Sequence, residues 1–406
     1  MKLGINLNRE SVILKQIIKQ LGFPINEGGI ICEGRDFTFN EENKYILNIQ
    51  QQELNVANKH SKIPFCDKLK FELLEQIVNL GHPIPRVSFY PSGKKACLVL
   101  THDVEWEYTI NELINRFLPI EESLGFRSTL FVRPVCADYG IKKIRLLLEE
   151  SITKGHEIGT HGDNDGKDYY SHLSFEHIKR EKEIMKSLNL NVKGVGNHGG
   201  FFLKRNWSEF EKAGYSYSRN KITQENLGGG KGFSYGTAWP WFPVIKSKQK
   251  KILEIYGHFQ EGIWIDHTNE KGVQTLAGLT KPINLLCSGV EKHLEELLET
   301  GSQYNSAVCV IFHPEDFCDP KQISTIYHNF LIEAKNRKYW VTTAGELEKW
   351  WRRRMDLNLD VDYNGKDLQI YSQNSSGFTI EIMNIEKVEN LFVNEKRCKP
   401  NKTIAL

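Results

Sequence analysis

From Ala96 to Thr343 the chain alternates apolar segments with segments of helical periodicity, and this alternation restricts the folds that it can adopt. The apolar segments are continuous rather than one-sided, which indicates parallel strands buried on both faces and joined by right-handed crossovers. Seven or eight such units over about 260 residues favour a barrel, with a doubly wound open sheet as the alternative. The predicted strands are 96–102, 127–133, 156–161, 192–198, 215–218, 251–256, 307–313 and 339–343.

The regions before and after this alternation differ from it in pattern, which predicts three parts. Residues 1–92 mix short helical and strand-like segments. Residues 93–354 form the predicted barrel. Residues 355–406 carry short alternating strands broken by Asn-Gly at 364–365 and Ser-Ser-Gly at 375–377, which are hairpin signals. We therefore expect an α/β protein: a barrel with a small mixed N-terminal domain and a short C-terminal β appendage.

Composition excludes several classes of protein. Hydrophobic residues make up 40% of the chain and charged residues 26%, which is ordinary for a globular protein. A formal net charge of +2 is too close to neutral to suggest a nucleic-acid partner. No apolar run approaches the roughly 20 residues of a membrane span, and the first residues are polar too early for a signal peptide. The eight cysteines form no Cys-x-x-Cys pair. These features predict a cytoplasmic protein.

Histidines and acidic residues gather where the predicted strands end. Asp103 and Glu105 follow the first strand, and His161, His198 and His313 each finish a later one. Because the carboxyl ends of parallel barrel strands meet at one face, we expect these side chains to share a site. Imidazole and carboxylate groups together suit Zn²⁺ or a similar divalent ion. Such an ion makes water more acidic, a separate carboxylate can accept the proton, and a separate histidine can protonate a leaving amine.

Five ordered motifs resemble a known family. They read THDVE, GHEIGTH, GVGNHGG, GFSYGTAWPWFP and VIFHPEDF, and the similarity around them covers roughly residues 93–354. In this order they are similar to the polysaccharide deacetylases (NodB homology, carbohydrate esterase family 4), and most to a divergent branch associated with surface-polysaccharide genes. The resemblance implies a distorted (β/α)7 barrel and the metal-dependent removal of an acetyl group from an N-acetylated sugar or oligosaccharide.

The resemblance also implies roles for individual residues. Asp103 matches the general base, and Glu105 matches the acidic metal ligand. His161 matches a histidine ligand of the second motif, and His313 matches the general acid of the last motif. The expected metal is Zn²⁺.

The match departs from the family pattern at the metal site. The family has an aspartate where this chain has Glu105, so the carboxylate reaches one methylene further. The second histidine of the second motif is replaced by Asp165. Three residues are therefore candidates for the third ligand: His198, which we favour because it matches a histidine of the divergent branch, and Asp165 or His172 as alternatives.

A second departure concerns the catalytic base. The arginine that usually braces the base is replaced by Gly196 in the third motif. We therefore expect Asp103 to be less well oriented and its pKa to be less controlled. Substrate contacts are expected from Trp239 and Trp241, whose rings could stack on a sugar, and from Asp266. Core packing explains the two tryptophans equally well.

The function predicted is that of a deacetylase, a hydrolase of non-peptide carbon–nitrogen bonds that acts in polysaccharide metabolism. Two alternatives remain open. One is a hydrolase of the same fold that acts on a cyclic amide or imide. The other is a catalytically weakened protein that binds carbohydrate, which the loss of the arginine would explain.

Overall fold

The computed structural model describes residues 12–25, 65–104, 109–134, 141–162, 174–197, 205–219, 237–246, 248–260, 283–313 and 320–406. Within these residues, nine strands form one sheet in the order β10-β11-β2-β3-β4-β5-β6-β9, with β12 also paired to β2. Their bounds are β2 (Cys97–Val104), β3 (Thr129–Val132), β4 (Glu157–Gly162), β5 (Gly194–Asn197), β6 (Tyr217–Ser218), β9 (Leu253–Glu254), β10 (Phe259–Gln260), β11 (Ala307–Phe312) and β12 (Trp340–Thr342).

The sheet is parallel and strongly curled. Every pairing within it is parallel. One short stretch of chain joins the two edges of the sheet. The strand β9 pairs with β6 at one edge, and β10, which begins five residues after the end of β9, pairs with β11 at the other. Between them, Ile255 donates to Ser218 and His258 donates to Cys309 through the backbone. The prediction of a distorted (β/α)7-type barrel is confirmed.

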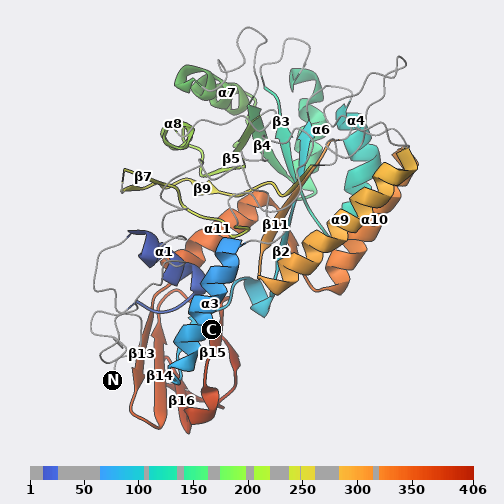
Figure 1. Ribbon diagram of the computed structural model, residues 1–406. Helices are drawn as coiled ribbons and strands as arrows, with labels where there is room; N and C mark the ends of the chain where they lie inside the picture. The colour runs from blue at the N-terminus through green and yellow to red at the C-terminus, as the bar shows by residue number, and fades with distance from the viewer. Residues whose placement is uncertain are drawn as a thin grey trace.

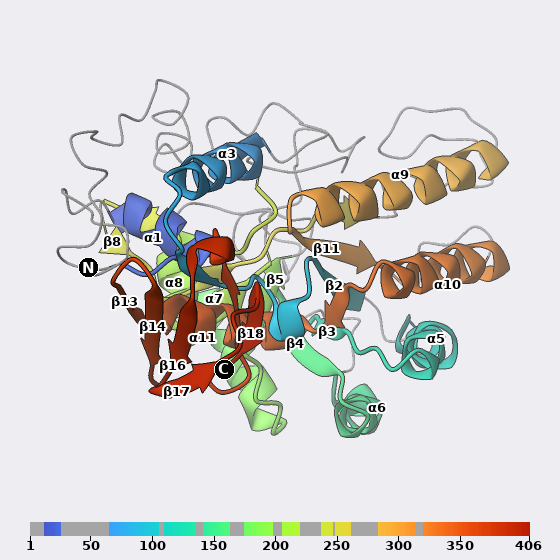
Figure 2. The ribbon, with the colours of Figure 1, turned by 90° about the horizontal axis from the view of Figure 1, so that it is seen from below.

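Helices cover the outside of the sheet (Figures 1 and 2). The segment after β2 is one irregular helix: α4 (Thr109–Glu112), a π-helical turn (Leu113–Phe117) and α5 (Leu118–Ser123). Pro119 lies inside this helix, just after the π-helical turn, and has no amide hydrogen to donate to the preceding turn. The remaining helices are α6 (Ile141–Thr153), α7 (Phe175–Ser187), α8 (Asn206–Lys212), α9 (Ile283–Gln303), α10 (Pro320–Asn336) and α11 (Ala344–Asp356). Among the described residues, no helix is long and apolar enough to cross a membrane.

The sheet separates two hydrophobic cores, and β2 shows why. Its side chains alternate between the two faces, so Leu98 and Leu100 enter one core while Cys97 and Val99 enter the other. The first core lies between the sheet and the helices that surround it. The second core includes residues of α1, α3, α11 and the C-terminal strands.

Segments before and after the barrel pack together at one end of it (Figure 1). The strand β1 (Pro85–Val87) pairs with β15 (Thr379–Ile382), which also pairs with β18 (Thr403–Ala405). Arg354 of α11 joins these parts, because its guanidinium donates to the carbonyls of Lys19, Val87 and Ser88. The division into three domains stays a prediction.

The remaining elements lie outside the nine-stranded sheet. They are α1 (Val12–Leu21), α3 (Phe65–Asn79), the 3₁₀ turns Pro91–Gly93 and Ile385–Lys387, the hairpin of β7 (Val244–Ile245) and β8 (Lys248–Gln249), and a four-stranded sheet of β13 (Leu359–Tyr363), β14 (Asp367–Ser372), β16 (Asn390–Val393) and β17 (Lys396–Cys398).

Candidate active site

Three of the predicted site residues meet at the carboxyl ends of the barrel strands. Asp103 lies near the end of β2, His161 lies on β4, and His313 follows β11 directly. The Nε2 atom of His161 lies 4.0 Å from Oδ2 of Asp103, and the Nε2 atom of His313 lies 3.7 Å from the same oxygen. All three side chains are buried. The strand ends therefore bring one carboxylate and two imidazoles together, as parallel topology requires.

The ring of His161 is held in one tautomer. Its Nδ1 atom lies 2.8 Å from the carbonyl oxygen of Gly196 on the neighbouring strand β5. A carbonyl can only accept a hydrogen bond, so Nδ1 carries the hydrogen and donates it. In the neutral ring this leaves the lone pair on Nε2, which faces Asp103. Histidines that bind a metal are commonly fixed in this way by a backbone carbonyl.

A residue that the sequence analysis missed, Arg219, holds the carboxylate. Arg219 follows β6 and is 2% exposed. Its Nη2 atom donates to both oxygens of Asp103, at 2.7 Å from Oδ1 and 2.9 Å from Oδ2. Its guanidinium carbon lies 4.5 Å from the ring centroid of Phe131, which provides a second contact from β3. The guanidinium is thus fixed by a carboxylate and an aromatic face.

The charge of Arg219 governs the pKa of Asp103. Burial by itself raises the pKa of this carboxyl, because it penalises the charged form. The positive charge of Arg219, followed by the interactions with the imidazoles of His161 and His313, acts in the opposite direction, and together they outweigh burial. The pKa of Asp103 therefore lies below its ordinary value, and the carboxylate is ionised at neutral pH.

The expectation that Asp103 lacks an arginine is wrong. Position 196 on β5 is indeed a glycine, but a Cβ atom placed there would lie 2.5 Å from Nη2 of Arg219. Gly196 therefore leaves the space that a guanidinium from the next strand fills. One signal in the sequence could have revealed this: Arg219 directly follows the predicted strand 215–218, at the carboxyl end where the other site residues lie.

Five predicted site residues lie outside the described part of the chain. They are Glu105, Asp165, His172, His198 and Asp266. Within the described part, no three histidine, cysteine or acidic side chains form a group that could hold a metal. The ligand set and the bound Zn²⁺ therefore stay predictions. The one described candidate ligand, His161, has the tautomer that a metal ligand needs.

The predicted sugar-stacking role of the two tryptophans is corrected. Trp239 is 0% exposed and Trp241 is 5% exposed. The ring of Trp239 lies 4.8 Å from that of Phe89, and its indole N–H donates to the carbonyl of Tyr304. Trp241 packs edge to face against Trp207 at 5.5 Å between ring centroids. Both rings fill the protein interior, so neither presents a face on which a sugar could stack.

His102 points away from Asp103, as the alternation of a strand requires. Its Nε2 atom lies 2.7 Å from Oε1 of Glu121, and its Nδ1 atom lies 3.1 Å from the carbonyl of Phe312. Tyr327 donates to the same glutamate oxygen at 2.6 Å. Burial raises the pKa of Glu121, but the charge and hydrogen bond of His102 outweigh it and lower that pKa below its ordinary value. This network ties β2 to α5 and α10 behind the site.

Comparisons with known proteins find similar structures but no similar sequence family. No protein-family model matches the chain. The search of curated proteins also returns no match. Among solved structures, a provisionally assigned polysaccharide deacetylase from Mycobacterium smegmatis superposes with a TM-score of 0.50 at 14% identity, over 65% of this chain and 93% of that one.

Two further structures are more distant. The Xyl-CE4 domain of a multidomain xylanase, from the hindgut metagenome of Trinervitermes trinervoides, gives a TM-score of 0.37 at 14% identity, over 63% of this chain and 90% of that one. A CE4 family pseudoenzyme from Bacillus anthracis gives 0.37 at 14% identity, over 64% and 66%.

The first of these superpositions defines the class: the fold is that of the NodB and CE4-type polysaccharide deacetylases. The resemblance seen in the motifs is thereby confirmed for the fold. At 14% identity the likeness concerns the fold alone, and the chemistry has to be argued from the side chains of this chain.

Proposed function

We propose that this protein is a hydrolase that removes the acetyl group from an N-acetylated sugar of a polysaccharide. One observation carries the proposal: a buried carboxylate, Asp103, is held by Arg219 and faces two imidazoles, His161 and His313, at the catalytic end of a deacetylase-type barrel. A carboxylate beside two imidazoles suits the hydrolysis of an amide, because one group can accept a proton from water and another can donate a proton to the leaving amine.

Asp103 is the general base in this proposal. Its lowered pKa keeps it ionised at neutral pH, so it can accept a proton from the attacking water. Arg219 is a positioning residue, because it holds both carboxylate oxygens and fixes their orientation. His313 is the general acid. Its Nε2 atom lies 3.7 Å from Oδ2 of Asp103, and from this position it can deliver a proton to the leaving amine.

The proposal includes a divalent ion, with Zn²⁺ as the expected species. His161 would be one ligand, with Glu105 and His198 as the others and Asp165 or His172 as alternatives to His198. When bound, such an ion makes a water molecule more acidic and polarises the amide carbonyl. The tautomer of His161 supports its part in this ligand set.

The experiment is a measurement of acetate release by the full chain. We expect release from at least one N-acetylated oligosaccharide when zinc is present, and a loss of at least about 100-fold in Asp103→Asn. Glu149→Gln, on the exposed side of α6, is the control and should keep full activity. Bound metal is measured separately in the wild type and in His161→Gln, which should retain less.

Three results would replace the proposal. Activity on a small cyclic amide, with none on any sugar, would identify the alternative hydrolase. Sugar binding without turnover across a panel of metals would identify a carbohydrate-binding protein. Full activity of metal-free protein would remove the metal from the mechanism.

A further inference from the structure

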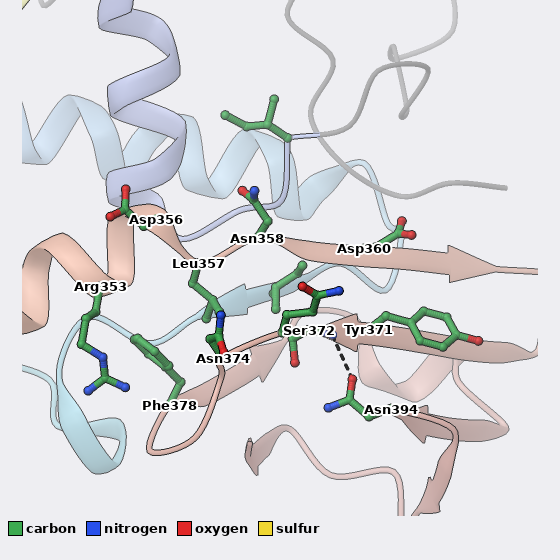
Figure 3. Close-up of a pocket in the computed structure, with 13 residues that line it drawn as sticks. Arg353, Asp356, Leu357, Asn358, Asp360, Tyr371, Ser372, Asn374, Phe378 and Asn394 are labelled. Atoms are coloured by element: carbon green, nitrogen blue, oxygen red, sulfur yellow. Dashed lines mark hydrogen bonds between the residues drawn. The ribbon is translucent and has the colours of Figure 1, made fainter.

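A cavity of about 790 Å³ lies between the end of α11 and the C-terminal strands (Figure 3). Its volume falls within the range of about 300–1,000 Å³ that is usual for ligand sites. The C-terminal end of α11 and the hairpin of β13 and β14, with the residues that follow each, form most of it. Three further residues come from elsewhere: Ile25 after α1, Phe378 before β15 and Asn394 after β16. It lies away from the site of Asp103. The strand β1 and the turn before β2 lie against β15, so the first residue of β2, Cys97, is at the end of the strand nearer the C-terminal strands. Asp103 lies six residues after Cys97, which is about 20 Å along an extended strand.

Amide side chains are the most frequent polar group in the lining of this cavity. Asn358, Gln373, Asn374 and Asn394 contribute four amides, and Figure 3 shows three of them, all but Gln373, labelled around the opening. Asn394 is fixed, because its side-chain oxygen accepts a hydrogen bond from the backbone of Ser372 at 2.9 Å. The other three amides make no hydrogen bond to any described residue, and all three are exposed.

An apolar floor lies beside these amides. Ile25 and Leu357 line the cavity and are partly exposed. The lining also includes Leu359 and Phe378, which are almost fully buried at 3% and 1% exposure. The guanidinium of Arg353 lies 5.0 Å from the centroid of the Phe378 ring and donates to the carbonyl of Ser376. The site therefore combines an apolar surface with planar polar groups that both donate and accept hydrogen bonds. Sugars present the same combination, since hydroxyl groups alternate with apolar C–H faces.

The charge of the lining disfavours an anionic ligand. The lining contains one cation, Arg353, and two carboxylates, Asp356 and Asp360, which gives it a formal charge of −1. A phosphate, a nucleic acid or an acidic peptide would meet net repulsion and only one cation. A neutral ligand that is rich in hydroxyl and amide groups meets neither obstacle.

We propose that this cavity is a second carbohydrate-binding site, which holds an uncharged segment of a polysaccharide at the end of the barrel opposite the catalytic face. The proposal rests on the proposed function only for the class of polymer, and the site itself involves no catalytic residue. It anchors the protein to the polymer while a different segment of polymer enters the active site.

The test measures glycan binding and turnover separately. Binding is measured with full-length Asp103→Asn, because this variant lacks the proposed base and does not hydrolyse the glycan. The protein is applied to an array of bacterial surface oligosaccharides of six or more units. The cavity variant adds Asn358→Ala and Asn374→Gly; glycine preserves the positive φ of 54° at position 374. The control adds Asn401→Ala to Asp103→Asn. Asn401 carries an exposed amide in the same C-terminal region and does not line the cavity. We expect the cavity variant to bind at least tenfold more weakly and the control to be unchanged.

Turnover provides the second arm. In a chain with Asp103 intact, the cavity substitutions should raise KM for the long polymer several-fold and leave kcat and the hydrolysis of an N-acetylated disaccharide unchanged. Equal glycan binding by Asp103→Asn with and without the cavity substitutions overturns the proposal, as does the absence of any binding by Asp103→Asn itself. If no sugar is hydrolysed but the cavity variant still loses binding, the proposed function fails and this site stands.

Discussion

Arg219 donates from a single nitrogen to both oxygens of Asp103, a residue 116 positions earlier in the chain. The pair joins the end of β6 to the end of β2 across the barrel. Gly196, on the strand between β4 and β6, makes the contact possible because it has no side chain. The orientation and ionisation of the proposed base thus depend on a residue outside the five sequence motifs.

Replacement of Arg219 by methionine should impair the base. The buried carboxylate of Asp103 would lose its strongest opposing charge, so its pKa should rise. We expect kcat/KM to fall by about 100-fold and the acid limb of its pH profile to move to higher pH. Arg352→Met is the control, because Arg352 pairs with Glu348 on α11. An unshifted acid limb in Arg219→Met would show that Arg219 does not control Asp103.

A methyl group at position 196 should displace Arg219. In Gly196→Ala the new Cβ would begin 2.5 Å from Nη2, so the guanidinium has to move. We expect at least a tenfold loss of kcat/KM, since small misplacements of this kind are costly in catalysis. In an Arg219→Met background the same substitution should have little further effect, and a double-mutant cycle measures this coupling. Additive losses would contradict the assignment.

His258 should make stability depend on pH. Burial lowers the pKa of its imidazole to about 4, while the backbone N–H of Cys309 donates to Nδ1 at 3.0 Å. The unfolded chain binds the proton near pH 6.5, so it binds more protons than the folded chain between pH 6.5 and 4. Stability contributed by this group is therefore lost as pH falls through that window.

The size of this effect can be measured by substitution. Between pH 7 and pH 5 the wild type should lose about 2 kcal/mol of unfolding free energy relative to His258→Gln. Urea titrations of both proteins at several pH values give the difference. A constant difference between pH 7 and 5 would mean that His258 titrates alike in the folded and unfolded chains.

The buried network behind the site should contribute to stability. Tyr327→Phe removes one hydrogen bond to Glu121 and should cost about 1 kcal/mol. Glu121→Ala leaves His102 without its carboxylate and opens space, so the cost should be about 3–5 kcal/mol. Glu149→Ala, at a half-exposed pair with Arg145, should change stability by less than about 0.5 kcal/mol. Chemical denaturation checks all three, and equal costs for Glu121→Ala and Glu149→Ala would exclude a role for the network.

The sequence alone determined the barrel and part of its site. Buried parallel strands need continuous apolar runs, and those runs could be counted. The carboxyl ends of such strands meet at one face, so Asp103, His161 and His313 could be grouped without coordinates. The hairpin of β13 and β14 was also predictable, because Asn-Gly at 364–365 suits its turn.

Only the tertiary structure decided the partners of these residues. Whether an arginine reaches Asp103 depends on which strand lies beside β5 and on the space at Gly196. Neither the neighbouring strand nor this space can be predicted from a local sequence pattern. Likewise, the aromatic rings of Trp239 and Trp241 are equally suited to a core and to a sugar, and only packing places them inside. Local periodicity identifies the strands and their buried faces, whereas contacts between side chains follow from the order and register of neighbouring strands.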